Sequence, residues 1–123
     1  MQVKLLEAYD LTIHKDGLRK AISAAKKSQK PGYTLCYKLL PEVFSLETLA
    51  NSRGECMKSA KEGDLRQCLD QTKVCAVKDY VVVWCKKIGH PTPLEPCLND
   101  AITERISYAR MQIKMALKKL KND

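Results

Sequence analysis

Residues 69–89 read LDQTKVCAVKDYVVVWCKKIG, and this stretch decides the fold. Its apolar side chains recur at i, i+3, i+7, i+10 and i+14, the spacing that lines one side of an α-helix. They are Val74, Val77, Val81, Trp84 and Ile88, with Val82 and Val83 widening the stripe. Asp70 stands at the N-cap position and Gly89 at the C-terminal stop. The stretch predicts a central helix over residues 71–88, with one side turned to the core.

The C-terminal segment, from about residue 98, predicts a longer and more basic helix. Its apolar residues alternate spacings of four and three: Ile102, Ile106, Ala109, Ile113, Ala116 and Leu120. Such a seam lets one helix lie along another. Its basic residues decorate the remaining faces: Arg105, Arg110, Lys114, Lys118, Lys119 and Lys121. We expect the first half of this helix to lie on the domain and the second half to be free to reach a partner.

Shorter elements are predicted before the central helix. Partial alternation of apolar residues over 3–13 favours a short β-hairpin. A helix follows, capped by Asp16 and running to about Ser28, and Pro31-Gly32 would stop it.

Residues 33–44 indicate a second, shorter helix, and Pro41 would either end it or start the next turn. Ser45 is placed to cap a further helical turn. Residues 51–68 contain two glycines and no sustained apolar period, so we expect a long loop there. The whole chain is expected to be one compact all-α domain of about five helices, with the short hairpin at its N-terminus.

The basic residues are unevenly distributed along the chain. It carries 22 Lys and Arg against 14 Asp and Glu, a net charge of +8. Residues 1–40 contribute +5, residues 41–98 are neutral, and residues 99–123 contribute +3. Basic ends around a neutral middle suit a polyanionic partner, either nucleic acid or an anionic membrane surface, but a lysine-rich soluble surface would give the same balance.

The cysteine and histidine pattern does not favour a metal site. The six cysteines contain no C-x-x-C pair, and close pairs of ligands are what most structural zinc sites use. The first 20 residues are charged throughout and resemble no signal peptide, which favours an intracellular protein with reduced, mostly buried thiols. We therefore expect no metal, no cofactor and no disulfide framework.

No motif of a common enzyme class is present. The sequence contains no Gly-rich phosphate loop, no H-E-x-x-H and no nucleophile elbow. Its two histidines, His14 and His90, fall in predicted connections. The sequence favours a protein that is not an enzyme and has no small-molecule substrate. The apolar side of the C-terminal helix is explained more simply by closing a small core than by membrane binding.

Three blocks of this sequence, in this order, resemble the BEN domain family: LLPEVFSLETLANSRG, LDQTKVCAVKDYVVVWCKKIG and LNDAITERISYARMQ. The matching residues of the first block are Leu39, Leu40, Phe44, Leu49, Ala50, Ser52 and Gly54. Those of the second are Leu69, Asp70, Val77, Tyr80 and Val81. In the third, Leu98-Asn99-Asp100 stands near the usual Ile-Asn. The resemblance covers about residues 16–115, the expected core of a single domain over 1–123, with 1–15 as an N-terminal extension. This chain departs from the pattern in its expanded loop over 55–66 and in the Pro-rich link before the last helix.

The resemblance implies an all-α module of a chromatin-associated transcription factor, usually a repressor, located in the nucleus. Some members belong to DNA viruses, which would instead imply cytoplasmic replication sites. Several members bind duplex DNA through the last helix and neighbouring loops, whereas others act chiefly as protein-interaction modules. It implies neither catalytic activity nor an obligatory metal.

A DNA-binding module is the leading hypothesis. The final helix would approach the major groove, with Arg105, Arg110, Lys114 and Lys118 contacting phosphates or bases. Arginine is the side chain suited to bidentate guanine recognition. Arg53 and Lys58 would contact the DNA backbone from the loop. The remaining candidates add non-specific attraction: Lys26, Lys27 and Lys30.

The alternative is a protein-interaction or oligomerisation module without specific DNA recognition. Its partner would be a second copy of the chain or a co-repressor protein. The contact would use the apolar seam of the final helix, namely Ile106, Ile113, Leu117 and Leu120.

Overall fold

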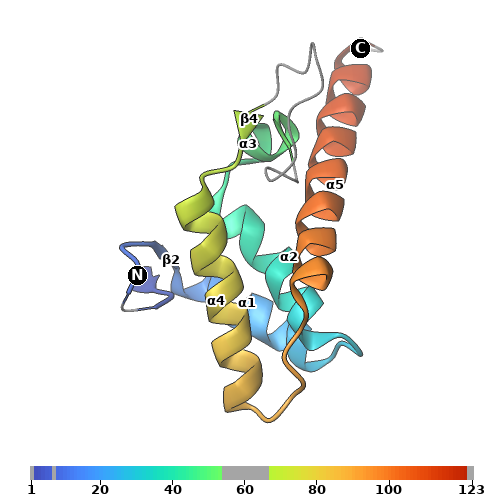
Figure 1. Cartoon of the computed structure of the whole chain (residues 1–123). Coiled ribbons are helices and arrows are strands. Elements are labelled where there is room, and N and C mark those ends of the chain that lie inside the picture. Colours follow the sequence, from blue (N-terminus) through green and yellow to red (C-terminus); the bar gives the residue numbers. More distant parts are fainter. Residues whose placement is uncertain (1, 7, 54–66, 122–123) are drawn as a thin grey trace.

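The chain folds around one hydrophobic core in the computed structural model, which describes residues 2–6, 8–53 and 67–121 (Figure 1). For residues 53, 67 and 121 only the backbone is described. Five helices and two short strand pairs make up the described part. The predicted all-α class, with a short N-terminal strand pair, is confirmed.

The N-terminal hairpin is part of the core. Strands β1 (Gln2–Lys4) and β2 (Thr12–His14) pair antiparallel, as predicted. Leu5 and Ile13 are buried in the same cluster as the helices, with exposed fractions of 5% and 1%. Leu5 and Ile13, which lie in the predicted N-terminal extension, therefore supply core side chains.

Helix α1 (Lys15–Lys26) begins directly after β2, with His14 at its N-cap. The prediction that Asp16 caps this helix is wrong, because the chain turns from strand to helix before reaching it. Asp16 lies in the first turn instead, where its carboxylate still opposes the positive end of the helix dipole. It also pairs with Arg19 at 3.5 Å on the surface.

Helix α2 (Pro31–Val43) is the central element, with α1, α4 and α5 all in contact with it. Pro31 begins this helix and does not merely end α1, because proline suits the first helical turn, where no N–H partner is lost. Pro41 was expected to end the helix or start the next turn but lies inside it. It removes a single backbone donor, and the helix ends two residues later.

Helix α3 (Leu46–Ala50) is the turn expected after Ser45, whose side chain accepts a hydrogen bond from the backbone N–H of Thr48. The chain then forms β3 (Ser52–Arg53), which pairs in parallel with β4 (Gln67–Cys68). Both ends of the predicted loop are thus held together by backbone pairing, which the sequence did not indicate.

Helix α4 (Gln71–Lys87) confirms the helix predicted from the opening stretch, but the central position predicted for it belongs to α2, which contacts three helices. Asp70 caps it by accepting hydrogen bonds from the backbone N–H groups of Thr72 and Lys73 at 3.0 and 3.3 Å. Gly89 follows it with φ of 78°, in the left-handed region that glycine adopts freely. The stripe is narrower than predicted, since Val83 is 50% exposed and Ile88 37%.

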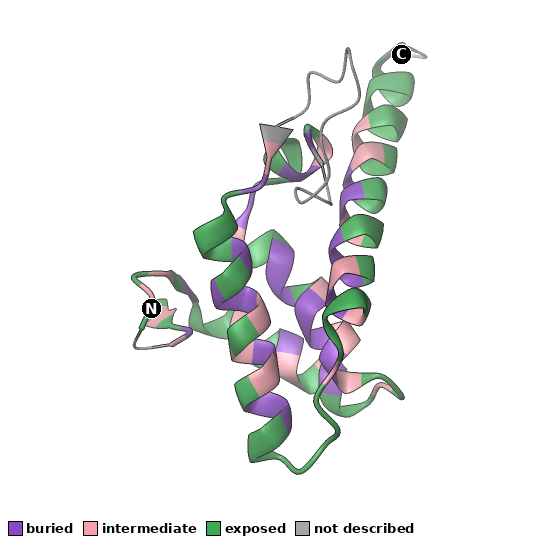
Figure 2. Cartoon of the chain, viewed as in Figure 1, coloured by how far each residue is buried: buried purple, intermediate pink, exposed green. Residues whose placement is uncertain are grey.

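Helix α5 (Glu95–Lys121) starts three residues earlier than predicted, because Pro96 is accommodated in its first turn. It lies against α2 and α3, and its buried residues end at Ala109 (Figure 2). The last turns are exposed, in agreement with the prediction that the first half of this helix packs on the domain and the second half is free. None of the helices in the described ranges is long and apolar enough to cross a membrane.

Among the described cysteines, two are buried free thiols and one departs from the expected reduced state. Cys36 and Cys85 are buried free thiols, as expected. Cys68 is disulfide-bonded, which corrects the expectation that all thiols are reduced. In the described ranges, no three His, Cys, Asp or Glu side chains come together as metal ligands.

Candidate nucleic-acid interface

Helix α5 carries a long stretch of basic residues without an opposing charge. Between Glu104 and Asp123 the sequence holds six Lys and Arg and no acidic residue. The first ten residues of the helix, by contrast, include three carboxylates: Glu95, Asp100 and Glu104. Any polyanion would therefore be attracted to the C-terminal two thirds of α5 and repelled from its beginning.

Arg105 stands where this basic stretch begins, between two tyrosine rings. Its guanidinium carbon lies 4.5 Å from the ring centroid of Tyr37 on α2 and 5.4 Å from that of Tyr108 on α5. The Tyr37 ring in turn stacks on Tyr33, with centroids 6.5 Å apart and planes at 12°. The hydroxyl of Tyr33 donates a hydrogen bond to the carboxylate of Glu104. We call Tyr37 and Tyr108 the tyrosine bracket.

The contacts with the tyrosine bracket do not use the N–H donors of the guanidinium. Within the described ranges Arg105 makes neither a side-chain hydrogen bond nor an ion pair, and it is half-buried. Cation–π contacts of this kind restrict the side chain without using its donors. Arg105 is therefore held in one place with donors left for a planar acceptor such as a phosphate or the edge of guanine.

Arg110 has a different environment. Its Nε donates a hydrogen bond to the carbonyl oxygen of Ala50 at 2.9 Å, and its Nη2 donates to that of Ser52 at 2.6 Å. These two carbonyls lie where α3 ends and β3 begins. Two donors of Arg110 thus join α5 to this turn. Its predicted role as a DNA contact stays a prediction, and the structure adds a role in holding the domain together.

Arg105 and Arg110 point to different flanks of α5. Five residues correspond to about 140° around a helix. The contacts agree, since Arg105 meets α2 and Arg110 meets the end of α3. The two arginines that were predicted as the best candidates for base contact therefore cannot bind the same base or phosphate of the DNA.

Lys114 and Lys118 follow Arg110 at one-turn intervals and are exposed. They carry the Arg110 flank out to the free half of α5. The structure leaves both ammonium groups accessible to phosphates, and their contact with DNA stays a prediction.

The other predicted basic residues that the structure describes with side chains lie at the far end of the domain. Lys26, Lys27 and Lys30 are exposed at the end of α1 and in the turn that follows. Figure 1 places that turn beside the beginning of α5, at the opposite end from its last turns. The side chain of Arg53 is not described, although its backbone in β3 pairs with Cys68. Lys58 lies outside the described residues.

The residues of the predicted apolar seam have different degrees of burial. Ile106 is 2% exposed and belongs to the core, so it is not available to a partner. Ile113 is half-buried, and Leu117 and Leu120 are 56% and 71% exposed. The free part of the seam is therefore its last two turns.

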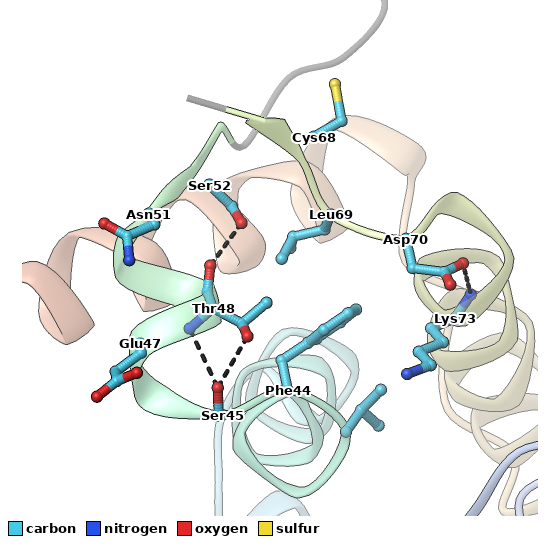
Figure 3. Close-up of a pocket in the computed structure, with 11 residues that line it drawn as sticks. Phe44, Ser45, Glu47, Thr48, Asn51, Ser52, Cys68, Leu69, Asp70 and Lys73 are labelled. Carbon is cyan, nitrogen blue, oxygen red and sulfur yellow. Dashed lines mark hydrogen bonds between the residues drawn. The ribbon is translucent and has the colours of Figure 1, made fainter. Parts of the chain in front are cut away.

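A hollow of about 850 Å³ lies between α3 and the start of α4, and Figure 3 shows its lining. Three of its polar side chains are used in local hydrogen bonds. Ser45 accepts from the N–H of Thr48, Ser52 donates its hydroxyl proton to the carbonyl of Thr48, and Asp70 caps α4. The ammonium nitrogen of Lys73 lies 6.0 Å from the centroid of the Phe44 ring. The Ser45 and Asp70 caps stabilise two helix N-termini, and the described residues that line the hollow offer no set of convergent groups for catalysis.

The sequence reasoning missed the tyrosine bracket. The three tyrosines of this cluster, at positions 33, 37 and 108, come from two segments that are far apart in the sequence. They come together only because α2 lies against α5. The signal available was the spacing of Tyr33 and Tyr37, one turn apart on a predicted helix.

A family model described as the BEN domain matches residues 34–106 of the sequence. No curated protein matches the chain. Among solved structures, the fold is similar to that in "Crystal Structure of the insv-BEN domain complexed to its DNA target site". The TM-score is 0.70 and the sequence identity 17%, over 100% of this chain and 98% of the other. At this identity the likeness establishes the fold.

Proposed function

This chain belongs to the BEN domain family, and from that premise we propose that it binds duplex DNA through the exposed side of α5. The family model covers more than half of the chain. The similar structure described above is a BEN domain complexed with its DNA target site, which supports the proposal.

The observation that carries the proposal is the environment of Arg105. Its guanidinium is held by two tyrosine rings, and its donors have no partner in the described part of the chain. It stands at the start of the acid-free basic stretch of α5. An arginine fixed by its faces loses little side-chain freedom on binding, which favours a bidentate contact to guanine over a mobile charge–charge contact.

The lysines on the other flank suit a second kind of contact. A helix in the major groove is bordered by the phosphates of both strands, so its two flanks meet different strands. Lys114 and Lys118 would bind phosphates of one strand, while Arg105 approaches from the opposite flank. The carboxylates at the beginning of α5 would keep that end away from DNA.

The cellular role follows as a further part of the proposal. DNA recognition of this kind suits a module of a transcriptional regulator, chiefly a repressor associated with chromatin in the nucleus. Lys26, Lys27 and Lys30 would add non-specific attraction from the far end of the domain, which depends on salt.

The test is selection of bound duplexes from a random library at about physiological salt. We expect enrichment of one motif that contains guanine. Arg105→Ala should weaken binding to that motif by about 1–3 kcal/mol, roughly fivefold to over a hundredfold, and Arg105→Lys should not restore it. Arg19→Ala is the control, since Arg19 is an exposed arginine on α1 that pairs with Asp16 on the surface. If the wild type binds all duplexes equally, and its affinity only falls steeply with salt, specific recognition is overturned.

Protein interaction is a second candidate function, favoured by the exposure of Leu117 and Leu120. A homodimer formed through α5 would sediment as a salt-insensitive dimer and dissociate in Ile113→Asp. A co-repressor partner would leave the isolated chain monomeric.

A further inference from the structure

A groove of about 500 Å³ lies between α3 and the free half of α5. Leu46 and Ala50 line it from α3, and Ile113 and Leu117 line it from α5. Leu46 is 43% exposed and Leu117 56%. Large apolar side chains that stay in water on two facing elements mark an interaction surface more often than a surface without function.

The spacing along α5 indicates what shape fits this groove. Ile113, Leu117 and Leu120 are separated by four and three residues, which continues the buried seam that ends at Ala109. A seam with this period matches the side of another α-helix, whose side chains enter between its own. The groove therefore suits an amphipathic helix that presents apolar residues at i, i+3, i+4 and i+7.

The charge around the groove indicates the sign of the partner. Lys114 lines it, and the surrounding part of α5 from residue 105 to 121 holds no acidic residue. One carboxylate, Glu47, faces the groove from α3. The balance is positive, so a helix with glutamates or aspartates beside its apolar stripe would be attracted and a basic helix repelled.

A second copy of the chain fits this surface poorly. Pairing two α5 helices along their free halves, from residue 110 to 121, would bring together two segments that each carry five Lys and Arg without an acidic residue. Like charges across such a seam are destabilising.

A lipid bilayer also fits poorly, because the apolar residues line a concave surface between two helices. Leu46 and Leu117 stand on its opposite walls. A bilayer surface cannot reach the floor between them, whereas a helix can.

We propose that the groove between α3 and α5 binds an acidic amphipathic helix of a partner protein. The apolar stripe of that helix would cover Leu46, Ile113 and Leu117, and its carboxylates would lie beside Lys114. The apolar contacts of this proposal lie outside the residues assigned to DNA, whereas Lys114 is shared by the two proposals.

The test uses a fluorescent synthetic peptide of about 18 residues, five helical turns, with leucines at alternating three- and four-residue spacing and glutamates on both flanks. Anisotropy at about physiological salt should show binding with a Kd of roughly 1–100 µM. Two control peptides are used, one with the same composition in shuffled order and one with lysine in place of glutamate. Both should bind at least about tenfold more weakly.

Variants locate the binding site. Leu46→Ala and Leu117→Ala should each weaken binding of the acidic peptide by about fivefold to tenfold, and neither residue supports the core. Met115→Ala is the matched control, because Met115 is 63% exposed and points about 160° away from Leu117 around α5. It should leave peptide binding unchanged.

Four outcomes would overturn the proposal: absence of binding at about 1 mM peptide, equal binding of the shuffled peptide, an equal effect of Met115→Ala, or a peptide-free dimer that Leu117→Ala dissociates. Tight binding to vesicles of phosphatidylcholine with phosphatidylserine, abolished by Leu46→Ala, would also overturn it in favour of a membrane. Leu46→Ala should retain selection of the DNA motif, so failure of the groove and failure of DNA binding are seen separately.

Discussion

Arg110 on α5 donates a hydrogen bond to the carbonyl oxygen of Ala50 at 2.9 Å, although the two residues stand 60 positions apart in the sequence. A second donor of the same guanidinium reaches the carbonyl oxygen of Ser52. The turn that follows α3 is thereby fixed to the last helix. An arginine first considered as a DNA contact thus determines where α3, and one wall of the apolar groove, lies.

We expect Arg110→Ala to lower the free energy of unfolding by about 1.5–3 kcal/mol, because two carbonyls lose a charged donor. Arg110→Lys should recover only part of this, since an ammonium group cannot span both carbonyls as the planar guanidinium does. Urea denaturation measures the change.

Lys114→Ala is the matched control for that experiment. Lys114 lies one turn further along the same flank and is exposed, so its removal should change stability by less than about 0.5 kcal/mol. Arg110→Ala with wild-type stability would contradict the structural role of Arg110.

Two glycines should respond in opposite ways to alanine. A methyl group on Gly32, at the start of α2, would come within 2.7 Å of the Pro93 ring, which cannot rotate away. Gly32→Ala should therefore destabilise the domain by about 1–3 kcal/mol. A methyl group on Gly17 would meet only the flexible end of the Glu42 side chain. Gly17→Ala should be neutral or stabilise the domain by up to about 1 kcal/mol through helix propensity.

Thermal unfolding of the two glycine variants beside the wild type gives the comparison. A loss of stability in Gly17→Ala as large as that in Gly32→Ala would mean that the Glu42 carboxylate cannot move aside.

The elements of the fold were largely predictable because they depend on local patterns. The valine stripe, the Asp70 cap and the Gly89 stop define α4 without reference to the rest of the chain. Errors arose where one element continues into the next, as at Asp16 and Pro31. An aspartate or a proline is compatible with several positions near the start of a helix. Which of these positions it occupies depends on where the preceding element ends.

The candidate site was less predictable because its chemistry depends on contacts between distant segments. Sequence periodicity placed Arg105 and Arg110 on the same basic helix but could not tell that one meets tyrosine rings and the other backbone carbonyls. That difference comes from α2 and α3 lying on opposite flanks of α5. The groove was hidden for the same reason, since Leu46 and Leu117 are 71 positions apart.

Alkaline pH should weaken the fold through Cys36. Burial raises the pKa of this thiol from 9.0 to about 12, and its neutral form donates to the carbonyl of Leu98. Because the folded pKa is the higher one, the stabilisation is complete below about pH 9 and is lost as pH rises toward 12. At pH 10 the loss from this group should be on the order of 1 kcal/mol relative to pH 8.

Urea denaturation at pH 8 and pH 10 measures this dependence in the wild type and in Cys36→Ala. The variant should be less stable at pH 8 because of the cavity but should lose less stability between the two pH values. An equal pH dependence in both proteins would exclude Cys36 as its source. Burial also raises the pKa of Cys85 and Tyr80, so some decline should remain.

The tyrosine bracket should control DNA affinity through Arg105. Tyr37→Leu keeps an apolar side chain against the core but removes the ring 4.5 Å from the guanidinium carbon. We expect this variant to bind the selected duplex about twofold to fivefold more weakly, the effect of losing a cation–π contact of about 0.5–1 kcal/mol. Tyr37→Phe keeps the ring and should bind like the wild type. The salt dependence should not change, because no positive charge is removed.

In a double-mutant cycle, Tyr37→Leu should have no further effect once Arg105 is alanine, since the ring then has no guanidinium to contact. Additive losses in that cycle would mean that Tyr37 affects DNA binding by a route other than Arg105.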